Sequence, residues 1–207
     1  DGNFLLGFSS GFMKDVEIVN LAASASSVTP KTFNFTGVSG VETINVGAAN
    51  AQIIVSNISD TGLTLNLSGQ STGAFDVGFA TGTISGSGSA LTVGLTDVGS
   101  TGTNVSLTAN LVTDLDIVSN GSNNNITLDG SVNDIQNISV AGAGDLVIGG
   151  IPSTASGFTA ASAGGDVTLT VDTDSNTVML ASGQTITGGA GFDSLSVQGS
   201  GIAAAAS

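Results

Sequence analysis

Short segments in which apolar and polar residues alternate with a period of two recur along the chain. Residues 41–46, 63–67 and 167–171 are clear examples. Alternation with this period turns one side of an extended strand toward a core and the other toward water. No window has the apolar spacing and the caps of an amphipathic helix. The sequence therefore predicts an all-β protein.

The residues between these segments favour tight corners. Gly, Ser, Thr and Asn account for 99 of the 207 residues. Gly and Asn accept the positive φ angles that sharp turns need, and they gather in turns such as residues 120–121 and 142–144. Val, Ile and Leu remain abundant enough to bury a core, so the composition favours a folded chain over a disordered one.

A weak internal repeat indicates how the strands stack. Residues 16–21 and 41–46 share Val, Glu, Asn and a terminal aliphatic residue at a spacing of 25, and residues 115–118 resemble residues 135–138 at a spacing of 20. A period of about 20 to 25 residues is that of one coil of a β-solenoid. We therefore predict a right-handed parallel β-solenoid (β-helix or β-roll), with an antiparallel β-sandwich as the alternative. Small residues at the corners favour the solenoid because they let coils stack closely.

The composition excludes several classes of function. The chain has no His, Cys, Trp, Tyr or Arg, and Lys14 and Lys31 are its only cationic side chains, against 14 Asp and 2 Glu. This rules out a Ser-His-Asp triad, a Cys nucleophile and an ordinary zinc or copper site. A net charge of −14 opposes binding to nucleic acid and to anionic membrane surfaces. No apolar run approaches the length of about 18 residues that a membrane-spanning helix needs.

One motif is specific. Residues 188–196, with the sequence GGAGFDSLS, fit the calcium nonapeptide G-G-x-G-x-D-x-U-x at every fixed position. We expect Gly188, Gly189 and Gly191 to form a tight turn whose carbonyls point inward, and Asp193 to add a carboxylate. Because Ca²⁺ takes about six to eight oxygen ligands, one such turn supplies only part of a site. The sequence therefore predicts Ca²⁺ bound between this turn and one of a neighbouring coil.

Incomplete partner turns precede two further strands, and one more acidic turn follows a strand. The candidate ligands in these turns are Gly144, Asp145, Gly165, Asp166, Asp172 and Asp174. Nine of the 16 acidic residues lie between Asp114 and Asp193, a stretch without lysine, so bound Ca²⁺ would relieve repulsion between stacked carboxylates. Asp60, Asp76 and Asp97 are expected instead to be turn residues that accept hydrogen bonds from their own backbone.

The V-E-x-I-N-V type of strand, the background rich in Gly, Ser, Thr and Asn, the absence of Cys and the nonapeptide at residues 188–196 resemble bacterial surface-layer proteins of the RTX type. The resemblance implies secretion through a type I system and a calcium-dependent two-dimensional lattice on the cell surface. The family usually carries arrays of nonapeptides, and this chain has one complete copy. The resemblance therefore suggests a segment of a longer protein.

The prediction from sequence is a non-catalytic structural protein that assembles with itself, with residues 1–157 as an assembly region and residues 158–207 as a calcium-binding region of one continuous solenoid. Cell-surface polysaccharide is a possible further partner through regions outside this chain, and membrane insertion is not expected. The alternative is an adhesin or an ice- or glycan-binding module, for which rows of Thr64, Thr92, Thr108 and Thr127 are the candidate surface. A third reading is an enzyme that uses Asp114 and Asp116, two carboxylates on one face of a strand.

Overall fold

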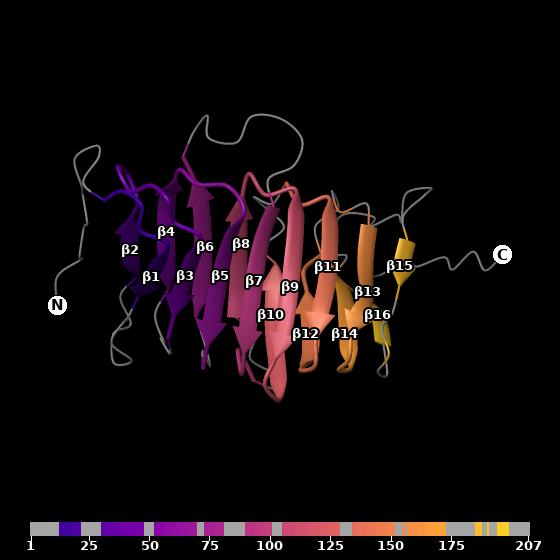
Figure 1. Ribbon diagram of the computed structural model, residues 1–207. Coiled ribbons are helices and arrows are strands. Elements are labelled where there is room, and N and C mark those ends of the chain that lie inside the picture. The colour runs from indigo at the N-terminus through magenta and orange to yellow at the C-terminus, as the bar shows by residue number, and fades with distance from the viewer. Residues whose placement is uncertain are drawn as a thin grey trace.

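The computed structural model describes residues 13–21, 30–47, 52–69, 73–80, 90–100, 105–128, 134–151, 155, 157–172, 185–187, 190 and 194–198. These residues form sixteen β-strands, all of which belong to two sheets (Figure 1). The described residues contain no helix, and hence none that is long and apolar enough to cross a membrane.

Each sheet has eight strands, and the chain alternates between the sheets from one strand to the next. The odd-numbered sheet runs in the order β1 (Ile18–Leu21), β3 (Thr43–Val46), β5 (Leu63–Ser68), β7 (Ala90–Thr96), β9 (Asp114–Asn120), β11 (Asn137–Gly142), β13 (Gly157–Ala163) and β15 (Thr185–Thr187). The even-numbered sheet runs in the order β2 (Lys31–Asn34), β4 (Ile53–Ile58), β6 (Ala74–Phe79), β8 (Val105–Asn110), β10 (Asn123–Leu128), β12 (Asp145–Gly149), β14 (Val167–Asp172) and β16 (Ser194–Gln198).

Every pairing between these strands is parallel. A chain that returns to the same sheet after each visit to the other, always with parallel pairing, is a parallel β-solenoid. The prediction of a parallel solenoid is confirmed, and the antiparallel sandwich is wrong.

The pairing register tests the repeat seen in the sequence. Ile18 pairs with Thr43 and Asn20 with Asn45, so the spacing of 25 is confirmed. Leu115 pairs with Ile138 rather than with Ile135, so the proposed spacing of 20 at this place was wrong, and the true one is 23. The reason is that Ile135 is a second buried aliphatic residue just before β11, and the apolar pattern alone does not tell it from the paired one.

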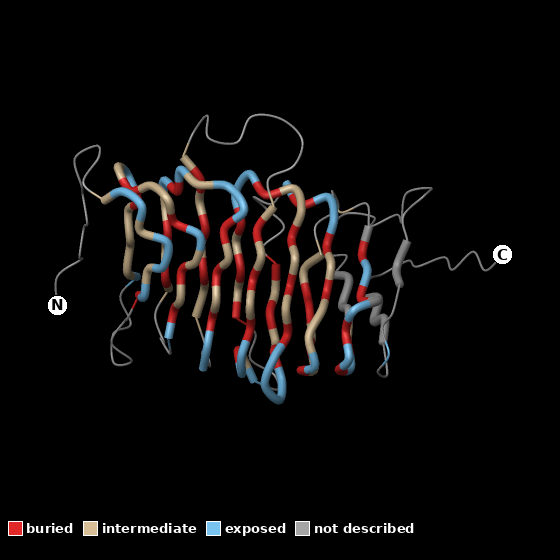
Figure 2. Tube along the Cα trace, in the orientation of Figure 1, coloured by how far each residue is buried: buried red, intermediate tan, exposed pale blue. Residues whose placement is uncertain are grey.

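The core lies between the two sheets, and buried positions alternate with less buried ones along the strands (Figure 2). Its apolar side chains, mostly aliphatic, form columns of residues that pair in register from strand to strand. Leu63, Leu91, Leu115 and Ile138 follow one another in register, and each is at most 1% exposed. Burying an aliphatic side chain of this size contributes about 1.5 to 3 kcal/mol. These columns account for the alternation in the sequence, since every second residue of a strand joins a column.

A ladder of asparagine amides runs along the outer face of the odd-numbered sheet. The Nδ2 of Asn45 donates to Oδ1 of Asn20 at 2.9 Å, and the Nδ2 of Asn66 donates to Oδ1 of Asn45 at 2.8 Å. The ladder stops at Gly94, the next residue in register. A Cβ atom at Gly94 would lie 2.3 Å from Oδ1 of Asn66, so Asn66 occupies the space that a side chain at position 94 would need.

Three aspartates that were predicted to bond their own backbone bond other segments instead. The carboxylate of Asp60 accepts from the backbone N–H groups of Gly40 at 3.0 Å and Val41 at 3.1 Å, and that of Asp97 accepts from Ser122 N–H at 2.8 Å. Asp76 lies inside β6 and accepts from Nε2 of Gln52. Stacking brings donors about 20 to 25 positions away into reach, and a prediction based on local turns cannot include them.

Asp60→Ala should lower the free energy of unfolding by about 2 kcal/mol, because hydrogen bonds to charged groups contribute about 1.5 to 3 kcal/mol each and this site is partly solvated. Asp60→Asn should lower the free energy of unfolding by about half as much, since one amide oxygen replaces two carboxylate oxygens as hydrogen-bond acceptors. Urea unfolding followed by circular dichroism measures both variants. The control is Asp134→Ala, at an exposed aspartate, and equal stability of Asp60→Ala and this control would contradict the prediction.

Candidate functional site

Successive turns from the odd-numbered to the even-numbered sheet stack at one corner of the solenoid, along the lower edge of Figure 1. Their backbones are joined from coil to coil: Gly144 N–H donates to Ser119 O at 3.0 Å, Gly164 N–H to Gly142 O at 2.8 Å, and Ala190 N–H to Ala163 O at 3.1 Å. We name this stack, from Ser119 to Ala190, the glycine corner. It contains the turns that the sequence singled out as partners in a metal site.

Two of the predicted ligand glycines at this corner have backbone atoms too close for a side chain. A Cβ atom at Gly165 would lie 2.7 Å from the carbonyl carbon of Gly144, and a Cβ atom at Gly144 would lie 2.8 Å from that of Asn120. Real Cβ contacts are longer than this, so any side chain would push the turns apart. Gly144 and Gly165, two of the five glycines predicted as calcium ligands, therefore already have a structural role.

A buried asparagine closes the core beside the glycine corner. Asn124, which is 1% exposed, accepts from Val98 N–H at 2.9 Å and donates from Nδ2 to Oγ of Ser119 at 2.8 Å and to Asn120 O at 2.8 Å. Burying an amide without such partners is costly. Its hydrogen bonds fix the turn between β9 and β10, on which Gly144 packs.

Two of the predicted calcium ligands meet at this corner. Oδ1 of Asp145 accepts from the backbone N–H of Asp166 at 3.0 Å, and Leu146 N–H donates to Asp166 O at 2.9 Å. Asp145 thus begins β12, and Asp166 directly precedes the neighbouring strand β14. No group of three acidic side chains close enough to hold a metal ion occurs among the described residues.

The other predicted ligands lie elsewhere or outside the described part of the chain. Asp172 ends β14 and pairs with Gln198, whereas Asp166 directly precedes this strand, so the structure does not bring Asp172 to the glycine corner. Six strand residues at about 3.3 Å each separate the two ends by roughly 20 Å. Gly188, Gly189, Gly191, Asp193 and Asp174 lie outside the described residues.

The nonapeptide links two described strands. It follows β15, which ends at Thr187, and its last three residues lie in β16, where Leu195 pairs with Leu169. The turn before β14 holds Gly165 and Asp166, so the neighbouring turn in the stack is one of the predicted partners. The sequence named this turn and the turn of Asp145 as incomplete partners without choosing between them, and the register of β14 with β16 makes the turn of Asp166 the neighbouring one.

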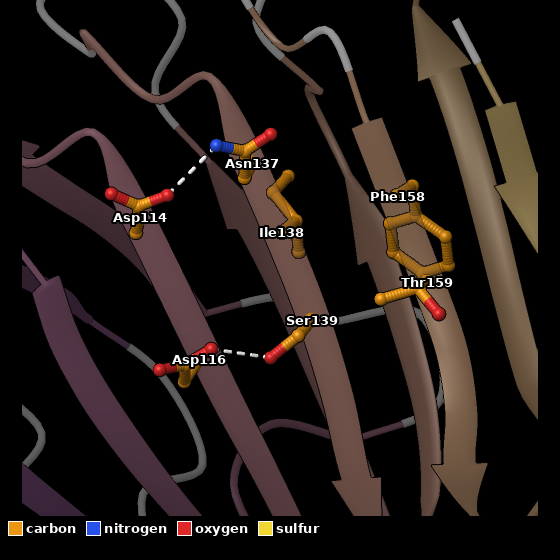
Figure 3. A pocket seen from close by; sticks show the side chains of 7 residues that line it. All are labelled: Asp114, Asp116, Asn137, Ile138, Ser139, Phe158 and Thr159. Atoms are coloured by element: carbon orange, nitrogen blue, oxygen red, sulfur yellow. Dashed lines mark hydrogen bonds between the residues drawn. The ribbon is translucent and has the colours of Figure 1, made fainter. Parts of the chain in front are cut away.

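A depression of about 190 Å³ lies on the outer face of the odd-numbered sheet (Figure 3). It is lined by Asp114, Asp116, Asn137, Ile138, Ser139, Phe158 and Thr159. The volume is below the range of about 300 to 1,000 Å³ that is typical of pockets for drug-sized ligands.

The two carboxylates of this depression lie on one face of β9, as the sequence suggested, but both accept hydrogen bonds from neighbours. Asp114 accepts from Nδ2 of Asn137 at 2.8 Å and from the hydroxyl of Thr113 at 2.9 Å, and Asp116 accepts from the hydroxyl of Ser139 (Figure 3). The bonds from Asn137 and Ser139 join β11 to β9, and they lie in other rows of the sheet than the asparagine ladder. The neighbours from β11 and β13 were not identified from the sequence, because finding them requires the spacing of 23 between the paired strands.

Hydroxyl groups form a column on the same face. Thr43, Thr64 and Thr92 pair in register, and the column continues through Asp116, Ser139 and Thr159. Of the four threonines proposed as a row, Thr64 and Thr92 are neighbours. Thr108 and Thr127 belong to the even-numbered sheet, where they pair with Asp76 and Ser106 instead.

No protein family, no curated protein and no solved structure matches this chain. The class of protein that the structure defines is the parallel β-solenoid with two parallel sheets.

Proposed function

We propose that this solenoid is a non-catalytic structural protein that binds Ca²⁺ and assembles with itself into a lattice on a bacterial cell surface, as secreted surface-layer proteins of the RTX type do. The observation that carries the proposal is the glycine corner. There, the turn with Gly144 and Asp145 stacks on the turn with Gly165 and Asp166, and this second turn neighbours the coil that holds the nonapeptide.

Calcium would bind between the nonapeptide turn, with Asp193, and the turn that holds Asp166. Backbone carbonyls of tight turns and carboxylates are the hard oxygen ligands that Ca²⁺ prefers. The chain has a net charge of −14, and a divalent cation at the corner would reduce the repulsion between acidic coils. Polysaccharide of the cell surface would contact regions outside this chain.

Self-assembly is supported by the character of the outer faces. They present Thr, Asn, Ser and Asp side chains in register, as in the asparagine ladder and the hydroxyl column. Repeated donors and acceptors of this kind suit polar contacts between copies rather than contacts centred on large aromatic side chains.

The test is light scattering and electron microscopy of the purified chain during a titration of Ca²⁺ against a chelator. We expect ordered clusters or sheets with Ca²⁺ and dispersed particles with chelator. Dispersed single molecules under both conditions would contradict assembly by this chain, and assembly that is insensitive to the chelator would contradict the role of Ca²⁺.

The hydroxyl column favours one alternative function, an adhesin or a module that binds ice or glycans. Thr43, Thr64 and Thr92 are spaced by the separation of neighbouring strands, about 4.8 Å, and could order water or meet sugar hydroxyls. An ice-shaping assay and a glycan array on the wild type and on Thr64→Val distinguish this function from the first. Binding that the variant loses, without calcium-dependent assembly, would favour the alternative.

A further inference from the structure

The first strand of the even-numbered sheet carries a lysine on its core side. Lys31 of β2 pairs with Ile53, which pairs in turn with Phe75, and Phe75 pairs with Leu107. Ile53, Phe75 and Leu107 are at most 1% exposed. Residues paired in register in a parallel sheet point to the same side, so the side chain of Lys31 leaves β2 toward the core.

The position of Lys31 is apolar in each of the next four coils. One continuous column of the core consists of Ile53, Phe75, Leu107 and Leu128. Lys31 occupies the next position of this column, on β2, and is half-buried. The methylene stem of a lysine can cover Ile53 while its ammonium group reaches water past the end of the stack. Among the described residues no further strand lies on top of β2, and a charged group at this position is therefore compatible with the fold.

β1 and β2 are the outermost strands of their sheets among the described residues, at the left end of Figure 1. An outermost strand offers unpaired backbone groups to another chain, and charged side chains that point inward are one device by which β-proteins prevent such pairing. Lys31 occupies the position where such a device acts, because a coil stacked on β2 would cover its ammonium group. Burying an unpaired ammonium group costs several kcal/mol.

We infer that Lys31 closes this end of the solenoid to a second copy of the chain. Copies therefore do not add end to end through β1 and β2, and any assembly uses the outer faces or the other end. This inference concerns the chain without Ca²⁺ and does not depend on the proposed function.

The test replaces the charge by an apolar side chain and measures association in the presence of a chelator, so that a failure of calcium-dependent assembly does not affect the result. In Lys31→Leu the exposed end of the core column becomes apolar. Size-exclusion chromatography with light scattering should then give an average molecular mass at least twice that of the monomer, and this mass should rise with protein concentration. Wild type should remain monomeric over the same range.

The matched control is Thr32→Leu, which adds the same side chain one residue along the same strand. Thr32 pairs with Ile54, on the outer side of the sheet, so this variant should remain monomeric like the wild type. Association of Thr32→Leu to the same extent as Lys31→Leu would overturn the inference, because general stickiness of the strand would then explain both.

A second variant keeps the test decisive if leucine does not fit. Lys31→Met retains an unbranched stem and removes only the charged end, and circular dichroism confirms whether each variant is folded. Monomeric behaviour of folded Lys31→Met or Lys31→Leu would overturn the inference, as would end-to-end filaments of the wild type in chelator.

Discussion

Wild-type protein should melt at a clearly higher temperature with Ca²⁺ than with chelator, and Asp193→Ala should lose this difference. A ligand that binds only the folded state at about 100 times its Kd adds about 2.7 kcal/mol. For a chain of this size that free energy corresponds to a rise in Tm of about 5 to 10 °C. Differential scanning calorimetry in Ca²⁺ and in chelator measures both proteins.

Two further variants show where the ion binds. Asp166→Asn changes the carboxylate of the neighbouring turn in the glycine corner and should reduce the calcium-dependent rise in Tm. Asp134→Ala removes an exposed carboxylate from the same acidic part of the chain and should leave the rise intact. A calcium-dependent rise that survives Asp193→Ala would refute the role of the nonapeptide.

The second large effect is expected at a glycine. Gly142 has a φ of 100°, and a Cβ atom there would lie 2.0 Å from the carbonyl oxygen of Ser119. Gly142→Ala should therefore lower the free energy of unfolding by at least about 3 kcal/mol, because backbone strain alone costs about 1 to 3 kcal/mol and the clash with a backbone atom adds to it. Urea unfolding of the purified variant gives the value.

The control lies one coil further along the same corner. A Cβ atom at Gly164 would have its nearest contact at 3.7 Å, to Gly142 O, which is ordinary van der Waals distance. Gly164→Ala should change stability by less than about 0.5 kcal/mol, as most surface substitutions do. If the two variants were equally stable, close contact of the turns could not be the reason for glycine at position 142.

The strands could be predicted from the sequence largely because the core is built from columns. In β5 and β9 every second residue is buried, and this produces the alternation that the sequence shows. β4 is less regular, since it carries Ile54 on its outer side and Asn57 with a φ of 58°. Its alternation is broken at these points, and it was not among the segments recognised.

The register was harder to predict because the coils differ in length. Paired residues are 20 positions apart between Asn137 and Gly157 but 32 apart between Ala74 and Ser106. A repeat of variable length produces no constant spacing between equivalent residues in the sequence. The neighbours of Asp114 and Asp116 in β11 and β13 could therefore not be predicted. The turns with Asp145 and Asp166 were foreseen, because each directly precedes an alternating segment.

The unequal coils have a consequence for how this protein tolerates changes in length. Between Ala74 and Ser106 the chain is longer than in neighbouring coils, yet Ala74–Gly78 and Ser106–Asn110 still pair without a shift. Additional residues are therefore taken up between strands and leave the hydrogen-bonded ladders unchanged. A peptide tag or a small domain inserted after Ala80 would be carried on the side of an intact rod, which makes this connection a natural position for displaying foreign sequences.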